Sequence, residues 1–131
     1  MRVENDTRLA AVFELFSEAP PQIVARYVAH AVDSAVRRGD EAMCTLLAEA
    51  IVRLEMQENY GALSKMMSAK ISDELYNYLA VLLAGTNRSP LLRILEEQLH
   101  AGRRPRVIAA ALRIRPTAEQ EAILRRWEDG D

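Results

Sequence analysis

Apolar residues recur at intervals of three and four along almost the whole chain, and this period restricts the possible folds more than any other feature. It is clearest in residues 40–58, DEAMCTLLAEAIVRLEMQE. The apolar positions there follow the spacing of one broad helix face: Met43, Leu46, Leu47, Ala50, Ile51 and Leu54. Asp40 is a favourable N-cap residue. We therefore expect a central helix over 40–58, with the other helices packed around it.

Proline, glycine and capping residues divide the remaining sequence into further helices. The chain has five glycines and five prolines, and they fall where helices would start or stop. No stretch shows the apolar–polar alternation of a half-buried strand. Besides the central helix, the sequence predicts helices over 7–18, 21–38, 61–71, 73–84, 90–101, 105–114 and 118–128. Ile23 and Tyr27 are among the residues expected on the buried face of the helix over 21–38. Thr117 and Gln120 have the spacing of a capping box at the start of the last helix.

The predicted fold class is therefore all-α, with about seven to eight short helices in a single compact domain over residues 1–131. A chain of this length buries roughly two thirds of its unfolded surface, so it needs no metal or disulfide to fold. Residues 1–6 and 128–131 are expected to fray. Because residues 39–40 leave a short connection, the helices on either side should form an antiparallel hairpin. An orthogonal bundle and a short HEAT-like stack of helical hairpins both fit.

The predicted helix over 73–84 is apolar on nearly all sides, which requires cover on most of them. It is expected to be either a second central element or part of a subunit interface. Tyr76 and Tyr78 on this helix are candidate interface residues, and so is Trp127 in the last helix. For Trp127, the favoured alternative is that it pins its own helix to the core.

Cysteine use and hydropathy indicate a cytoplasmic protein. The single cysteine, Cys44, cannot form an internal disulfide, and its place on the central helix is typical of a small buried side chain. The first eighteen residues lack the apolar region of a secretory signal. The longest apolar run, residues 78–85, is too short to span a bilayer, so we expect no membrane association.

Charge is distributed unevenly along the chain. Residues 1–60 carry six basic and ten acidic side chains, a net charge of −4. Residues 88–126 carry nine arginines and four glutamates, a net charge of +5. The simpler interpretation is solvated helix faces with some pairing inside the molecule. The alternative is a basic surface for an acidic partner.

The sequence contains one weak metal-ligand pattern and no convincing catalytic motif. Glu97 and His100 form an E-x-x-H pair on one helix face, but di-iron bundles need two such pairs, and His30 has Tyr27 where the second glutamate would stand. Glycine-rich phosphate loops, C-x-x-C and G-x-S-x-G are absent. We therefore expect no catalytic, cofactor-binding or metal site, and interpret His100 as a helix-terminal residue that the helix dipole favours.

Residues 107–114, VIAAALRI, resemble the core of a bacterial helix-turn-helix, which runs roughly I-A-x-x-L-G-I. The matching positions are Ile108, Ala109, Leu112 and Ile114. The resemblance implies that Ala109 lets the two helices approach closely and that Ile114 fills the gap at the turn. It also implies that arginines around this segment lie near DNA phosphates.

This segment departs from the helix-turn-helix pattern in two places. Arg113 stands where the family has its turn glycine. The presumed DNA-reading helix opens with Glu119 and Glu121, whose carboxylates would repel the DNA backbone. The sequence therefore favours an ordinary helical hairpin over 105–128.

By elimination, the sequence predicts a non-catalytic helical protein–protein interaction module: an adaptor, a regulator or a chaperone-like partner that can form a homo-oligomer. The alternative is a DNA-associated regulator that uses residues 105–128. The candidate contacts for an acidic protein partner or for nucleic acid are the arginines of the basic segment: Arg103, Arg104, Arg106, Arg113 and Arg115.

Overall fold

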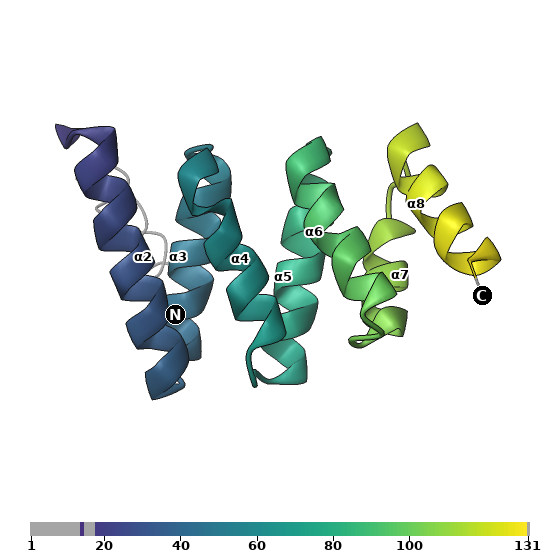
Figure 1. Cartoon of the computed structure of the whole chain (residues 1–131), viewed down its shortest axis with the longest axis horizontal. Coiled ribbons are helices and arrows are strands. Elements are labelled where there is room, and N and C mark those ends of the chain that lie inside the picture. The colour runs from purple at the N-terminus through teal and green to yellow at the C-terminus, as the bar shows by residue number, and fades with distance from the viewer. Residues whose placement is uncertain (1–13, 15–17, 131) are drawn as a thin grey trace. The chain divides into compact units, whose positions relative to one another are not determined.

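The computed structural model describes Glu14 and residues 18–130, and this part of the chain is all-α, as predicted (Figure 1). Its elements are α2 Pro21–Arg38, α3 Glu41–Arg53, the short 3₁₀ helix η1 Gln57–Asn59, α4 Tyr60–Ser68, α5 Asp73–Gly85, α6 Ser89–His100, α7 Pro105–Leu112 and α8 Ala118–Asp129. The helix predicted over 7–18 lies outside the described residues except for Glu14 and Glu18. No helix of the described part combines the length and apolar character needed to cross a membrane.

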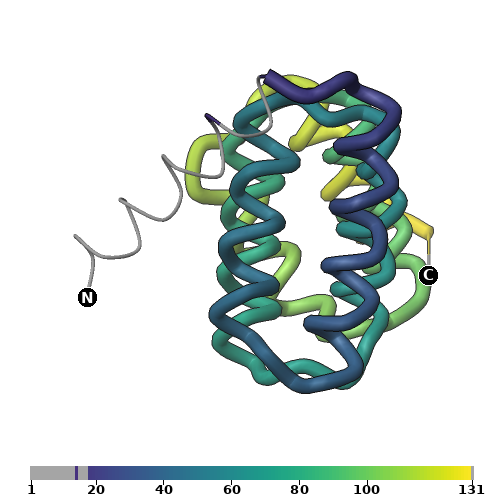
Figure 2. The backbone as a smooth tube through the Cα atoms, turned by 90° about the vertical axis from the view of Figure 1, so that its left-hand side faces the viewer, coloured from purple at the N-terminus to yellow at the C-terminus, as the bar shows by residue number. Residues whose placement is uncertain are grey.

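The chain forms two compact units, Met1–Met66 and Met67–Asp131. In the first unit α2 packs against α3 and η1. Figure 2 looks onto this unit and shows α2 and α3 side by side, as the predicted hairpin requires. The prediction of one domain over 1–131 stays a prediction.

The turn between α2 and α3 forms for local reasons that the sequence displays. Gly39 adopts a φ of +67°, a conformation that glycine reaches without a steric penalty. The N–H of Asp40 donates to the carbonyl of Ala35 (2.9 Å). The Asp40 carboxylate accepts from the N–H of Met43 (3.1 Å), which caps α3 as expected.

The central helix is shorter than predicted, because α3 ends at Arg53 and does not continue through residue 58. Glu55 adopts a φ of +53°, and the N–H of Met56 then donates to the carbonyl of Ile51 (2.9 Å). This is the hydrogen bond of a Schellman termination, in which glycine normally occupies the left-handed position. A glutamate there gives no sequence signal, so the predicted helix over 40–58 was wrong at its end.

The second unit contains α5, α6, α7 and α8, and each of these packs against the next. In addition, α5 packs on α7 and α6 packs on α8. Alternate helices are thus neighbours, which is the contact pattern of stacked hairpins and favours that alternative within this unit. Most of the apolar surface of α5 is covered, and Leu75, Tyr76, Leu79 and Leu83 are all buried. The helix is therefore a central element of its unit, the first of the two roles predicted for it.

The last helix is fixed at its start by a capping box. The N–H of Gln120 donates to the Thr117 hydroxyl (3.3 Å), and the side-chain oxygen of Gln120 accepts from the N–H of Thr117 (3.0 Å). The spacing of these two residues predicted this arrangement. The Gln120 side-chain nitrogen also donates to the carbonyl of Ala84 (2.6 Å), which ties α8 to the end of α5.

Candidate functional site

Arg104, a candidate partner contact, is used inside the second unit. Its guanidinium donates to the carbonyls of Ile71 (2.8 Å) and Ser72 (3.1 Å) and lies 3.4 Å from the Asp73 carboxylate. It also lies 4.7 Å from the centroid of the Tyr76 ring, in cation–π geometry. These contacts hold Arg104 at a φ of +44°, a left-handed conformation that is costly for a side chain other than glycine. Its evident role is to fix the connection between α6 and α7.

Arg103 and Tyr76 belong to the same network. Arg103 donates to the carbonyl of Ser68 (2.6 Å). The Tyr76 hydroxyl lies 2.9 Å from both the Gln98 side-chain oxygen and the Arg103 carbonyl, so its one hydrogen is shared between two acceptors. Burial raises the pKa of Tyr76, an effect that the nearby arginines partly oppose. Because Tyr76 is 1% exposed, it offers a partner no surface in this conformation.

The other three candidate arginines lie at the surface. Arg113 pairs with Glu128 at 2.9 Å, and both side chains are about half exposed. Arg106 and Arg115 are exposed. Their role as contacts for an acidic partner or for nucleic acid stays a prediction.

The structure does not contain the turn that the helix-turn-helix resemblance implies. α7 ends at Leu112, two residues earlier than predicted, and Arg113 adopts a φ of −89° instead of the left-handed conformation that a turn glycine serves. Ile114 is 61% exposed, so the expectation that it fills the gap at the turn was wrong. Ile114 does not fill the gap because it lies beyond the end of α7 and is exposed to solvent. Ala109 is buried, as the resemblance implied.

Tyr78 and Trp127, the remaining candidate interface residues, are half-buried. Each residue therefore presents part of its surface to solvent. Trp127 lies on α8, one turn beyond the buried Ile123 and Leu124. Whether either side chain serves an interface stays a prediction.

His100 pairs with Glu96 rather than with the Glu97 of the E-x-x-H pattern. Its Nε2 lies 3.7 Å from the Glu96 carboxylate, and Arg126 of α8 donates to the same oxygen at 2.8 Å. The hydrogen bond from Arg126 is the main cause that lowers the pKa of Glu96. Glu97 is exposed. Within the described residues, no three His, Cys, Asp or Glu side chains are placed to hold a metal ion.

Cys44 is buried, as expected from its place on the central helix. Burial raises the pKa of its thiol, and the carboxylates of Asp40 and Glu41 raise it further. The thiolate is the reactive form of cysteine, so this environment makes Cys44 a poor nucleophile. The structure supports a packing role for it.

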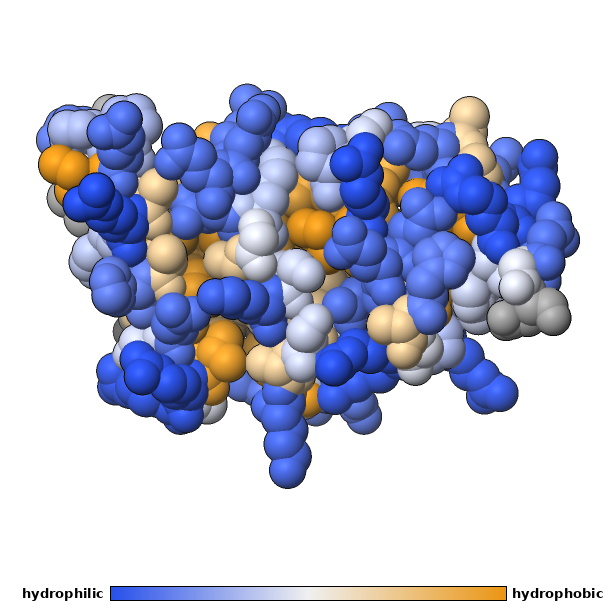
Figure 3. Space-filling model, viewed as in Figure 1, coloured by the Kyte–Doolittle hydropathy of each residue, from blue (hydrophilic) through white to orange (hydrophobic). Residues whose placement is uncertain are grey.

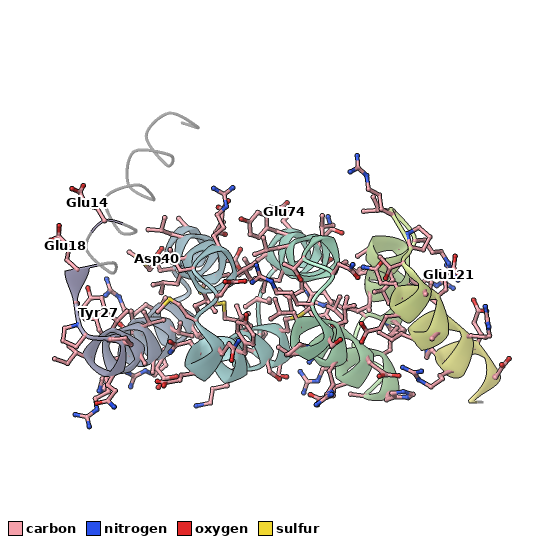
Figure 4. The ribbon with its side chains drawn as sticks, turned by 90° about the horizontal axis from the view of Figure 1, so that it is seen from above. Glu14, Glu18, Tyr27, Asp40, Glu74 and Glu121 are labelled. Carbon is pink, nitrogen blue, oxygen red and sulfur yellow. The ribbon has the colours of Figure 1, made fainter. Side chains whose placement is uncertain are left out.

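Ile23 and Tyr27 on α2 are surface residues that the sequence interpretation missed. Both were assigned to the buried face of the helix over 21–38, and both are 61% exposed, so that assignment was wrong. Figure 4 labels Tyr27 on α2. The buried positions are Val24, Val28 and Val32, with Ala35 at the end of the same face. The apolar arc of α2 is simply wider than the surface that α3 and η1 cover. The signal that could have revealed this is the position of residues 23 and 27 at one edge of that arc.

His30 and Ser34 continue the row that begins with Ile23 and Tyr27. Residues at these intervals share one side of a helix. His30 is exposed and Ser34 is half-buried. We call the surface formed by Ile23, Tyr27, His30 and Ser34 the outer flank of α2.

The open end of the α2–α3 hairpin contains a hollow of about 550 Å³. Its apolar wall includes Pro21, Val24, Leu54 and Met56. Asn59 also lines it and is buried, and its side-chain oxygen accepts no hydrogen bond from the described residues. Among the described residues that line the hollow, Glu55 and Glu58 are acidic and none is basic.

The orientation of the Asn59 amide is fixed by its nitrogen. That nitrogen donates to the carbonyl of Ala25 (3.0 Å), and a flipped amide would place two acceptors against each other. The side-chain oxygen therefore points away from Ala25, and a buried acceptor that stays unpaired costs about 1–3 kcal/mol.

Comparison of the chain with protein-family models, with curated proteins and with solved structures finds no match. Its function is therefore inferred from the described side chains alone.

Proposed function

We propose that the chain is a non-catalytic helical interaction module that binds a protein partner through the outer flank of α2. One observation carries this proposal: Ile23 and Tyr27 are each 61% exposed and lie one helical turn apart. Adjacent large apolar side chains in water favour cover by a partner, and burying each one contributes about 1.5–3 kcal/mol. Tyrosine is also among the residues that most often dominate binding energy.

The spacing of the outer flank suggests how the partner binds. Positions 23, 27, 30 and 34 have the i, i+4, i+7 and i+11 intervals by which one helix lies in the groove of another protein. Ile23 and Tyr27 would enter apolar pockets, and His30 would lie at the polar edge. The partner is therefore expected to offer an apolar groove about as long as three helical turns.

The other exposed apolar residues support the proposal less strongly. In the described part of the chain, the remaining large ones are Val81 and Ile114. Ile114 stands between Arg113 and Arg115, and single surface hydrophobics of this kind are common. Figure 3 shows a largely hydrophilic face with apolar residues between hydrophilic ones.

The alternative of a DNA-associated regulator draws less support from the described residues. Arg104 is engaged by the carbonyls of residues 71 and 72, and the helix-turn-helix turn is missing. The Glu119 carboxylate accepts a hydrogen bond from Ser89 (3.0 Å) and remains at the start of α8, where it would face the DNA backbone.

The test is retention of proteins from native cell extract by three immobilised forms of the chain. They are the wild type, the double variant Ile23→Asp/Tyr27→Asp, and Ile114→Asp as a control with the same 61% exposure at the substituted residue. We expect the wild type and the control to retain the same protein, and the double variant to lose it. Retention by all three forms alike, with all three folded by circular dichroism, would overturn the proposal.

A further inference from the structure

We infer that the hollow at the open end of the α2–α3 hairpin binds an aliphatic ammonium ion, that is, a positively charged amine on a short apolar chain. The described residues that line the hollow lie between Ala19 and Asn59, so they all belong to the first unit. None of them belongs to the outer flank of α2. The inference therefore does not rest on the proposed function.

The size and the wall of the hollow suit a small ligand with an apolar part. Its volume of about 550 Å³ is within the range of about 300–1,000 Å³ that is usual for ligand sites. Pro21 and Val24 of the wall belong to α2, whereas Leu54 and Met56 follow the end of α3. An aliphatic chain can be buried against these side chains while its charged head stays at the opening.

The charges around the hollow determine the sign of the ligand. Glu55 and Glu58 line it and are exposed, and none of the described lining residues is basic. Arg53, the last residue of α3, forms an ion pair with Glu49, so part of its positive charge is already balanced. Residues 1–60 also carry a net charge of −4. These charges favour a cation over a neutral or an anionic ligand.

A buried acceptor at the same hollow favours a ligand that donates hydrogen bonds. Asn59 is 4% exposed, and its side-chain oxygen accepts no hydrogen bond from the described residues. Its side-chain nitrogen donates to the carbonyl of Ala25 (3.0 Å), so the oxygen needs a donor from elsewhere. An ammonium group has three N–H donors and no acceptor, so one group can donate both to this oxygen and to a carboxylate.

The ammonium group has to displace a side chain to reach this oxygen, because less than 1 Å² of the oxygen surface is accessible. Asn59 ends the single 3₁₀ turn Gln57–Asn59, and the other two residues of this turn, Gln57 and Glu58, are exposed. Their side chains can move without exposing apolar surface. We therefore expect the ammonium group to enter at this turn.

The test is a titration of the isotope-labelled full chain with pentylammonium chloride, followed by NMR. The backbone and side-chain amide signals of Asn59, and the backbone amide signals of Val24 and Met56, should shift and saturate. The expected Kd is on the order of 1 mM, because so small a ligand has few atoms to contribute.

Three analogues separate the contributions of the charge and of the chain. Pentanol and pentanoate keep the chain but have a neutral and an anionic head, and methylammonium keeps the charge without the chain. Each should bind at least about tenfold more weakly than pentylammonium. Shifts that do not saturate, or equal shifts with methylammonium, would show only a general attraction of cations and would overturn the inference. Equal affinity for pentanol would overturn it as well, because the charge would then not matter.

Two variants test the residues assigned to the ammonium group. Glu58→Gln and Asn59→Leu should each weaken the binding of pentylammonium about tenfold, because the first removes a carboxylate and the second removes the amide oxygen. Glu74→Gln removes an exposed carboxylate from the second unit and is the matched control, with unchanged affinity. Circular dichroism verifies that each variant is folded. Unchanged affinity in either Glu58→Gln or Asn59→Leu would contradict the assignment.

A free amine and a lysine side chain share this chemistry, and a last arm of the titration distinguishes them. Lysine with both backbone ends blocked carries the same ammonium group on a flexible aliphatic stem. Affinity equal to that of pentylammonium would identify a lysine of another protein as a ligand, and binding at least about tenfold weaker would restrict the site to free amines. Both results agree with the inference. The retention experiment uses neither ligand, so it tests the proposed function independently.

Discussion

α2 and α8 differ in how far their large apolar side chains are buried. On α8 the large aliphatic side chains, Ile123 and Leu124, are buried. On α2 the buried residues are accompanied by Ile23 and Tyr27, each 61% exposed. Both helices are amphipathic, so amphipathicity does not separate them. The two helices differ in how much of the apolar arc the described residues cover.

Neighbouring helices explain this difference. α8 lies against both α6 and α7, and the hydrogen bonds from Gln120 to Ala84 and from Arg126 to Glu96 hold it there. In the described part of the chain, α2 packs substantially only against α3 and η1. The uncovered part of its apolar arc is the reason to look for function at α2 rather than at α8.

The largest expected effect comes from making the same substitution on both helices. Ile123→Ala should lower the free energy of unfolding by about 2–4 kcal/mol, because it removes buried methyl groups and leaves a cavity. Ile23→Ala should lower it by less than about 1 kcal/mol, because the side chain is largely exposed. Urea unfolding of the two purified variants measures both values, and equal losses would contradict the distinction between the helices.

Replacing the two buried side-chain amides, Gln120 and Asn59, should change the stability of the protein by different amounts. Gln120→Met should destabilise the protein by about 2 kcal/mol, because it leaves the Ala84 carbonyl and the Thr117 N–H without their side-chain partner. Asn59→Leu should change stability by less than about 1 kcal/mol, because the hydrogen bond it loses is offset by removal of an unpaired oxygen. Chemical denaturation gives the comparison, and a larger loss for Asn59→Leu would show that its oxygen has a partner in solution.

A smaller gain is expected at the end of α3. Glu55→Gly should stabilise the first unit by up to about 1 kcal/mol, because glycine adopts a positive φ without the steric penalty of a Cβ atom. Glu58→Gly, at the middle residue of the 3₁₀ helix Gln57–Asn59, is the matched control and should destabilise by about 0.5–1 kcal/mol. Thermal unfolding of both variants is sufficient, and a loss of stability in Glu55→Gly would refute the strain at this position.

The smallest expected effect is on the pH dependence of stability, through the hydrogen bond between Arg126 of α8 and Glu96 of α6. The pKa of Glu96 is lowered in the folded protein, chiefly by its hydrogen bond from Arg126. A lowered pKa means that the folded state prefers the charged carboxylate. The stabilisation is therefore present above the ordinary glutamate pKa and is lost as pH falls through the lowered value.

Glu96→Gln removes this titration, so its stability curve should fall less steeply below about pH 4.5 than that of the wild type. The comparison is made by urea unfolding between pH 3 and pH 7. Identical slopes for the two proteins would remove Glu96 as the source of the acid sensitivity. Glu97→Gln makes the same change at an exposed position of the same helix and is the control.

Helix starts were predictable because their causes are local. Asp40, Ser72 and Thr117 each accept a hydrogen bond from an N–H three residues further on. The residue type and the spacing are both visible in the sequence. The all-α class follows from the same kind of information, since the apolar period needs no knowledge of distant contacts.

Features decided by distant contacts were not predictable. α3 ends where Glu55 adopts a left-handed backbone conformation. Arg104 also adopts a left-handed conformation, and its side chain is held by carbonyls more than thirty residues away. The arginine pattern suggested partner contacts but could not show which guanidiniums the chain itself would use. The exposed flank was missed because periodicity gives the width of an apolar arc and not which part a neighbour covers.

The most direct test of the central claim is the affinity of the retained partner, once purified, for three forms of the chain: the wild type, Ile23→Ala and Ile114→Ala. If the partner binds the outer flank of α2, Ile23→Ala should weaken binding about tenfold, which corresponds to about 1.4 kcal/mol. Ile114→Ala should leave the affinity unchanged. Unchanged affinity for Ile23→Ala, with a loss in Ile114→Ala, would place the interaction surface on the second unit and contradict the account.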